Sequence, residues 1–184
     1  MASPQNNLQY LLNSLPDKRT GFTFTNIFKK IRAVDPGLAV GILAGATLSA
    51  TGDKHAGRVI NLNALAGSVV TLPAAIGSGD KYRFFVSAIA TSNSHIVKVA
   101  SATDFFVGTI LSISTTPSTT NGWIAANSAT VGTNSDTVTL NRSTSGSVTV
   151  GEYFDVQDVG TATWTITGVL TQSGVAVTPF SAGV

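Results

Sequence analysis

Three acidic residues lie close together in the C-terminal part of the sequence, at Glu152, Asp155 and Asp158. Carboxylate oxygens bind Ca²⁺ when a loop brings them to one point. The surrounding residues predict a strand, however, and residues three positions apart in a strand do not share a face. The EF-hand pattern is also missing from this stretch. We therefore interpret the three as separately placed side chains, with a metal site as the alternative.

His95 is the second candidate for chemistry, because it follows Asn93 and Ser94. Asp104 or Asp136 could complete a Ser–His–Asp arrangement with it. No Gly-x-Ser-x-Gly elbow or other setting for a nucleophile is present in the sequence. The favoured interpretation is therefore a histidine at the end of a strand or at an interface.

The counts of cysteine and histidine exclude several kinds of site. The chain has no cysteine, which excludes disulfides, thiolate zinc sites and cysteine nucleophiles. Its two histidines, His55 and His95, are too few for a three-His metal centre. We expect a protein that is not an enzyme and has no catalytic residues, no cofactor and no metal.

Gly77 to Asp80, with the sequence Gly-Ser-Gly-Asp, is a short glycine cluster that could surround a phosphate. A phosphate loop requires a helix N-terminus or a lysine at a fixed spacing after it. The run that follows, residues 81–87, predicts a strand instead. We therefore predict a hairpin loop here.

Trp123 lies within residues 114–135, where Ser, Thr, Asn and Gly dominate. We predict that this stretch is a long surface loop. An exposed tryptophan among such polar residues could stack on a sugar ring. Trp164 differs, because it alternates with threonines as a core residue of a strand does.

The elements that must position these residues are mostly strands. From residue 58 onwards, short runs rich in β-branched and aromatic residues are separated by Gly, Ser, Asn and Asp turn signals. About ten such runs predict a mainly β fold, either a β-sandwich or a jelly-roll-like barrel. The predicted strands are 58–62, 68–72, 82–86, 95–99, 105–113, 136–140, 147–150, 153–156, 163–170 and 175–177.

Two short amphipathic helices are predicted before the strands, as a helical N-terminal arm. Leucines recur at helical spacing between residues 8 and 15, and Phe and Ile residues do so between residues 24 and 31. Helices this short are unstable alone in water, so we expect them to dock on protein. We place this arm in residues 1–50 and a β-sandwich domain in residues 51–184.

The second helix carries the residues that we expect to make the docking contact. Its apolar stripe packs on protein in this interpretation, while its basic side chains are solvated or face acidic groups. A nucleic-acid reader would need a longer basic stripe, and a membrane-surface helix would need more apolar length and charge. The docking residues are Phe24, Ile27, Phe28, Lys29, Lys30, Ile31 and Arg32.

Charge is scarce and unevenly distributed along the chain. Charged residues make up 11% of the sequence, against about 25% in ordinary soluble proteins, and the net charge is +2. Residues 17–35 are basic and residues 99–184 are acidic, which indicates two regions with different partners or simply a dipolar surface. The longest apolar stretch, 38–46, is far shorter than a membrane span, and no signal peptide is visible. We expect a protein made in a cytoplasm.

Several segments of the sequence resemble a recurring module of tailed-bacteriophage virion proteins, particularly head decoration (cement) proteins and some fibre-like proteins. These segments of predicted strands and loops lie between residue 57 and the C-terminus, and none contains a catalytic motif. The segments are Thr71–Phe85, Ser92–Asp104, Ser135–Asn141, Thr163–Leu170 and Thr178–Ala182.

This resemblance implies a non-enzymatic, usually trimeric β domain attached to a phage capsid or tail. We therefore expect a capsid cement protein that forms a homotrimer and binds the major capsid protein. We expect neither nucleic acid nor a membrane as a partner, and we expect the protein in the phage head, assembled in the host cytoplasm. The alternative is a head or tail fibre-like protein that adsorbs to host surface glycan, and a polysaccharide depolymerase comes third.

Overall fold

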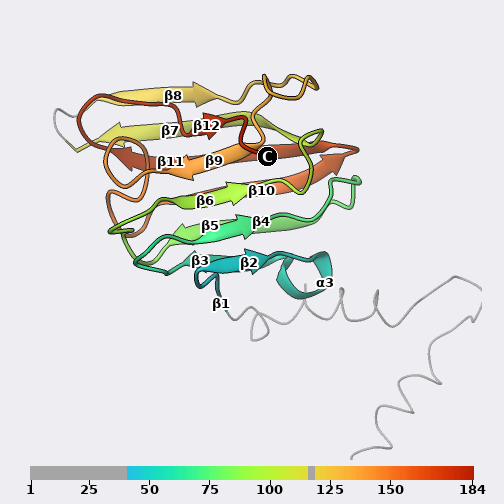
Figure 1. Ribbon diagram of the computed structural model, residues 1–184, viewed down its shortest axis with the longest axis horizontal. Helices are drawn as coiled ribbons and strands as arrows, with labels where there is room; N and C mark the ends of the chain where they lie inside the picture. Colours follow the sequence, from blue (N-terminus) through green and yellow to red (C-terminus); the bar gives the residue numbers. More distant parts are fainter. Residues whose placement is uncertain (1–40, 116–118) are drawn as a thin grey trace, which may run out of the picture. The chain divides into compact units, whose positions relative to one another are not determined.

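The computed structural model describes residues 41–115 and 119–184. Its fold is mainly β, with two mixed sheets (Figure 1). The seven-stranded sheet contains, in spatial order, β1 (Ile42–Leu43), β3 (Arg58–Leu62), β5 (Lys81–Val86), β10 (Tyr153–Gly160), β11 (Thr163–Gln172), β7 (Phe105–Ser114) and β8 (Thr120–Ile124). The five-stranded sheet contains β12 (Phe180–Ser181), β9 (Thr137–Leu140), β6 (His95–Lys98), β4 (Val69–Thr71) and β2 (Thr47–Ser49). A single-turn helix, α3 (Gly52–His55), precedes β3.

From β1 to β6 the chain crosses from one sheet to the other after every strand. It therefore returns to each sheet in the same direction. As a result β1, β3 and β5 pair in parallel in one sheet, and β2, β4 and β6 pair in parallel in the other. Parallel neighbours need a crossover connection, and here each crossover includes one strand of the opposite sheet.

The second half of the chain adds antiparallel pairs. β7 pairs with β8, and β10 pairs with β11. The β10–β11 pair lies between β5 and β7, so that β11 runs parallel to β7 along ten residues. Gly108 allows this close approach, because a Cβ atom there would lie 2.1 Å from the carbonyl oxygen of Ile166. Its φ of 130° is also one that side-chain-bearing residues rarely adopt.

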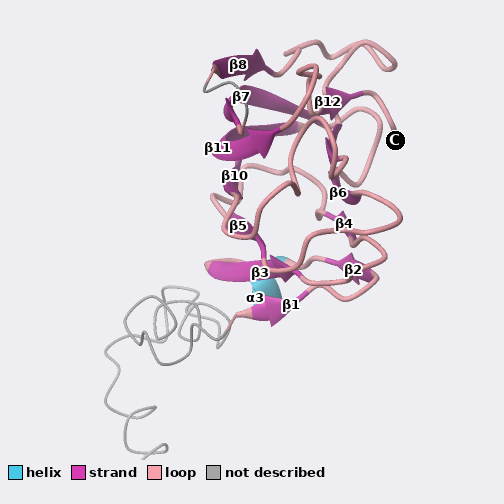
Figure 2. Cartoon of the chain, turned by 90° about the vertical axis from the view of Figure 1, so that its left-hand side faces the viewer, coloured by secondary structure: helices cyan, strands magenta, loops and turns pink. Residues whose placement is uncertain are grey.

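The two sheets face each other as two layers in Figure 2, and their facing side chains form one core. Alternate residues of each strand point to the same face, so every second residue of the long strands is buried. Tyr82 packs on Trp164 with ring centroids 5.8 Å apart, and Phe84 stacks on Phe154 at 5.1 Å. The largest fully buried side chains are Trp164, Tyr82, Phe84, Phe106, Phe154, Ile60, Leu62, Leu72, Ile110, Leu140, Leu170 and His95.

The mainly β fold predicted from the sequence is confirmed, and Trp164 is a core residue as its alternation indicated. Half of the strand pairings are parallel, whereas a jelly roll is antiparallel. Residues 42–49, assigned to the arm, supply one strand to each sheet. The two predicted helices lie outside the described residues. Within residues 41–115 and 119–184, no helix is long and apolar enough to cross a membrane.

Some predictions of local structure from the sequence are wrong. Residues 147–150 and 175–177 are not strands, and the N–H groups of residues 147–149 donate to a side chain, that of Glu152, rather than to a neighbouring strand. Residues 114–135 are not a continuous loop, because residues 120–124 form β8 at the edge of the seven-stranded sheet. The sequence did not predict this strand because Ser, Thr, Asn and Gly, which are typical of loops, dominate the stretch. Trp123 lies in β8 and packs partly buried against the core, so it does not stand free in a polar loop as a platform for sugar.

Two fragments test the contribution of β1 and β2. We expect residues 41–184 to give a β-type circular dichroism spectrum and a cooperative thermal transition. Residues 51–184 should melt at a lower temperature, because they lack an edge strand of each sheet together with Ala44 and Ala50, which are buried in the core. Equal melting temperatures would contradict a role for these strands, and a helical or disordered spectrum of the longer fragment would contradict the fold.

Candidate functional site

The face of the seven-stranded sheet that points away from the five-stranded sheet, here called the outer face, carries the exposed side chains of β5, β10, β11 and β7. The strand register decides which of them are neighbours, because directly paired residues project to the same side. A polar row crosses these strands through Arg83, Asp155, Thr167 and Thr109. An apolar row lies beside it and consists of Phe85, Tyr153, Val169 and Leu111.

A bidentate ion pair joins β5 to β10 in the polar row. Nε and Nη2 of Arg83 donate to the two carboxylate oxygens of Asp155 at 2.7 and 2.6 Å. The guanidinium also lies over the ring of Tyr153, 4.9 Å from the ring centroid. The hydrogen bonds to Asp155 raise the pKa of Arg83. Both charges are therefore already neutralised, although the side chains are 51% and 37% exposed.

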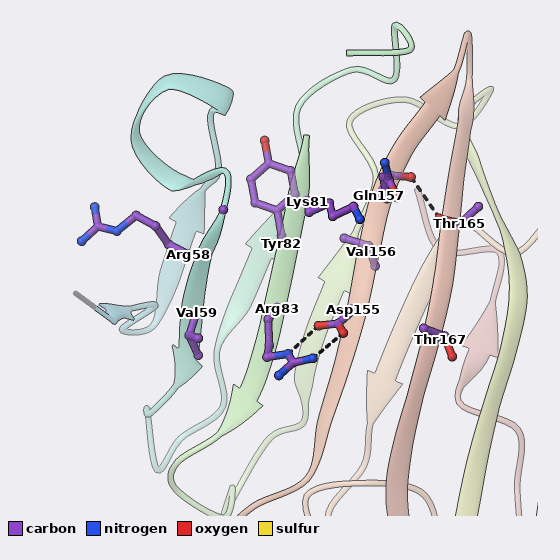
Figure 3. A pocket seen from close by; sticks show the side chains of 11 residues that line it. Arg58, Val59, Lys81, Tyr82, Arg83, Asp155, Val156, Gln157, Thr165 and Thr167 are labelled. Atoms are coloured by element: carbon purple, nitrogen blue, oxygen red, sulfur yellow. Dashed lines mark hydrogen bonds and ion pairs between the residues drawn. The ribbon is translucent and has the colours of Figure 1, made fainter. Parts of the chain in front are cut away.

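Two shallow hollows on the outer face share Arg83 and Asp155 as lining residues. The larger, of about 490 Å³, is drawn in Figure 3, where Lys81 extends toward Gln157. The second, of about 420 Å³, extends over the apolar row to Leu111. Small-molecule sites usually enclose most of their ligand, whereas these hollows are open. Their form is better suited to contact with a macromolecular surface.

Toward β8 the outer face has an exposed apolar end. Leu111, Ile113 and Ile124 are 45%, 46% and 79% exposed, and Ile124 pairs with Thr109 across the β7–β8 ladder. Large apolar side chains that face water do not gain the favourable free energy that their burial would provide. A contiguous group of them on a folded surface is typical of an interaction site.

The acidic residues singled out in the sequence do not converge. Asp155 lies on the outer face, while Glu152 and Asp158 are buried on the opposite side of the strand. Glu152 accepts hydrogen bonds from the N–H groups of residues 147–149 at 2.7 to 2.8 Å, and from the hydroxyl of Thr171. Within residues 41–115 and 119–184, no three His, Asp or Glu side chains are close enough to hold a metal ion.

Asp158 holds the glycine cluster in place. Its carboxylate accepts hydrogen bonds from the N–H groups of Ile76, Gly77 and Ser78 at 2.7 to 3.1 Å. Burial alone would raise the pKa of Asp158, but these N–H groups stabilise the charged form more strongly and lower the pKa below its ordinary value. The loop therefore does surround an anion, which belongs to the chain itself. It connects β4 to β5 in different sheets, so the predicted hairpin is wrong.

His95 has a structural role at the start of β6. Its Nδ1 accepts the N–H of Ser68 at 2.9 Å, and its Nε2 donates to the carbonyl oxygen of Ala88 at 2.8 Å. Burial lowers the pKa of His95, so the ring is neutral at neutral pH. The histidine thus joins two connections between the sheets, as its predicted place at a strand end allowed. Asp104 accepts from the N–H of Ala75, and Asp136 from that of Gly183.

The residues proposed for docking, between Phe24 and Arg32, lie outside the described residues. The outer face itself was missed by the sequence analysis. The alternation of Tyr153, Asp155 and Gln157 with buried residues was its signal, but only the strand register shows that Arg83 pairs with Asp155. Comparison with family models, curated proteins and solved structures finds no match for the chain.

Substitution of Asp158 tests the role of the buried carboxylates. Asp158→Asn should lower the free energy of unfolding by about 1 to 3 kcal/mol, because an amide cannot accept three N–H groups as a carboxylate does. The folded-state pKa lies below the ordinary value of 3.8, so this stabilisation is complete above that pH and is lost as pH falls through the folded-state pKa. Urea unfolding of both proteins at pH 7 and in acid measures the difference.

Asp155→Asn is the matched control on the same strand. Its ion pair is exposed, so the substitution should cost less than about 1 kcal/mol. If the two variants lose equal stability at pH 7, or if the deficit of Asp158→Asn persists unchanged in acid, the role assigned to the Asp158 carboxylate is contradicted.

Proposed function

We propose that the chain is a structural virion protein of a tailed bacteriophage, a cement protein that binds the assembled capsid and stabilises it. The observation that carries this proposal is the outer face, which is broad and open and has its central charges paired with each other. Burial of such a face against protein avoids the cost of removing unpaired charges from water. The resemblance of the sequence to phage decoration proteins supports the same function.

In this proposal the described part of the chain is a β-sandwich that packs against its own copies as a homotrimer. Leu111 and Ile113, in β7 at the apolar end of the outer face, supply hydrophobic contact area between subunits. The buried carboxylates of Glu152 and Asp158 have a structural use as acceptors for loop N–H groups. We therefore assign the protein no catalytic role.

Attachment to the major capsid protein is assigned to the N-terminal arm. Phe24, Ile27, Phe28 and Ile31 would form the apolar anchor, with Lys29, Lys30 and Arg32 near acidic groups of the capsid. Binding only to the assembled lattice favours the assembled state by mass action. A trimer strengthens the effect, because its second and third contacts form at high effective concentration.

Two single substitutions in the full-length chain test this attachment. Phe28→Ala should weaken binding to undecorated heads by about 3 to 5 kcal/mol if the ring is fully packed in the contact. Lys30→Gln should cost less than about 1 kcal/mol, and less still at high salt. Co-sedimentation with undecorated heads assembled from the major capsid protein of the same phage measures both affinities. Unchanged affinity of Phe28→Ala, or of a chain without residues 1–36, would refute the assignment.

Sedimentation equilibrium of the full-length protein tests the trimer. We expect a mass three times that of the 18.9 kDa chain, or a multiple of that mass, because the outer face is buried only on association. Leu111→Lys should reduce the mass, since it places an unpaired charge in the contact. A monomer at the highest attainable concentration, both free and on heads, would exclude the trimer.

One observation favours the alternative, a fibre-like protein that adsorbs to host surface glycan. Tyr153, Arg83 and Asp155 line the smaller hollow and place an aromatic ring beside planar polar groups, an arrangement that can bind sugars. Purified host surface polysaccharide should then bind the free protein, and Tyr153→Ala should abolish the binding. Binding to heads without binding to polysaccharide favours the cement protein.

A further inference from the structure

β8 is an unusually open edge of the seven-stranded sheet. In both Figure 1 and Figure 2 it is the outermost strand next to β7, and among the described residues no strand lies beyond it. The other edge strands, β1, β2 and β12, have only two or three residues each, whereas β8 has five. Proteins usually protect such edges with Lys, Pro or a short strand. β8, with the sequence Thr-Asn-Gly-Trp-Ile, has none of these protections.

The register shows which main-chain groups of β8 face outward. The N–H of Ala125 donates to the carbonyl of Gly108, and the carbonyl of Thr119 accepts the N–H of Ser114. In an antiparallel ladder, alternate residues direct both main-chain groups to the same neighbour. The odd-numbered residues of β8 therefore face β7. The N–H and C=O groups of the even-numbered residues, Thr120, Gly122 and Ile124, point to the open edge.

The surroundings of this edge carry no charge. The sequence has no Lys, Arg, Asp or Glu between Asp104 and Asp136, a span that contains β7, β8 and the segment after β8. A surface that meets an identical surface is repelled by its own charges, and this edge has none to repel. Two copies of this edge therefore do not repel each other electrostatically. The edge also has no charge of its own that would attract a basic or acidic partner.

We propose that β8 pairs with β8 of a second copy of this chain in antiparallel orientation, about a two-fold axis at Gly122. In this register Gly122 lies opposite its own counterpart, and Thr120 lies opposite Ile124 of the second copy. Each of these pairs exchanges two main-chain hydrogen bonds, as hydrogen-bonded pairs of an antiparallel ladder do. The seven-stranded sheets of the two copies become one continuous sheet.

Side chains on the outer face support the same register. Thr120 pairs with Ile113 within one copy, so Ile124 of the second copy would be next in that row. Ile124, 79% exposed in the single chain, would then be partly covered by Thr120 of the other copy. The contact is isologous and separate from any three-fold contact through the rest of the outer face, so it would join two trimers rather than compete with them.

A single introduced cysteine tests the register, because the chain has none of its own. Gly122→Cys should form a disulfide-linked dimer under mild oxidation, since hydrogen-bonded partners have Cα atoms about 5.5 Å apart, within the range that disulfides span. The substitution fits the single chain, where a Cβ would lie 3.8 Å from Leu111 Cδ2, an ordinary contact. Val175→Cys, at a position 82% exposed in a loop, is the matched control.

The proposal predicts at least tenfold faster dimer formation for Gly122→Cys than for Val175→Cys, measured on non-reducing gels with the full-length protein. Equal rates overturn it. Ile124→Lys, with Val175→Lys as control, should halve the mass found by sedimentation at high concentration. It should leave unchanged the melting temperature measured in dilute solution, where the β8 contact is dissociated in both proteins. An unaltered mass also overturns the proposal. Neither measurement involves capsids, so failure here is distinguishable from failure of the cement function.

Discussion

Every second side chain of β10 and β11 is buried, and this alternation positions both the core and the outer face. Phe154, Val156 and Trp164 point toward the five-stranded sheet, where their burial provides the main stabilisation of the fold. Their neighbours Tyr153 and Asp155 must then point the other way. The outer face is therefore not an independent feature. A register shift of one residue would exchange the two faces and destroy both.

The connections between the two sheets depend on buried hydrogen-bond acceptors. A chain that crosses between two sheets after each strand from β1 to β6 has many connections, and each connection brings main-chain N–H groups that need partners. Asp158 and Glu152 each accept several of these groups, and His95 joins two connections at once. This use explains why acidic residues outnumber basic ones in residues 99–184 although little of their charge reaches the surface. Acidity in this region therefore reflects internal hydrogen bonding as well as surface charge.

The sequence predicted what depends on local pattern. Runs of β-branched and aromatic residues located most of the strands, and the threonine alternation around Trp164 identified its buried face. Strand order was beyond reach, because parallel pairing of β3 with β5 depends on the intervening strand lying in the other sheet. β8 was missed because its residues are typical of loops. The Arg83–Asp155 pair spans 72 positions in the sequence, so only the fold could bring it together.

We propose that the outer face, which is poor in unpaired charge, is a surface for contact between subunits on a phage capsid. Electron cryomicroscopy of undecorated heads incubated with the full-length protein tests it most directly. The account predicts added density on the capsid surface in three-fold clusters, with the seven-stranded sheets of neighbouring copies facing each other. Heads without added density at saturating protein, or isolated single copies whose outer faces point into solvent, would contradict it.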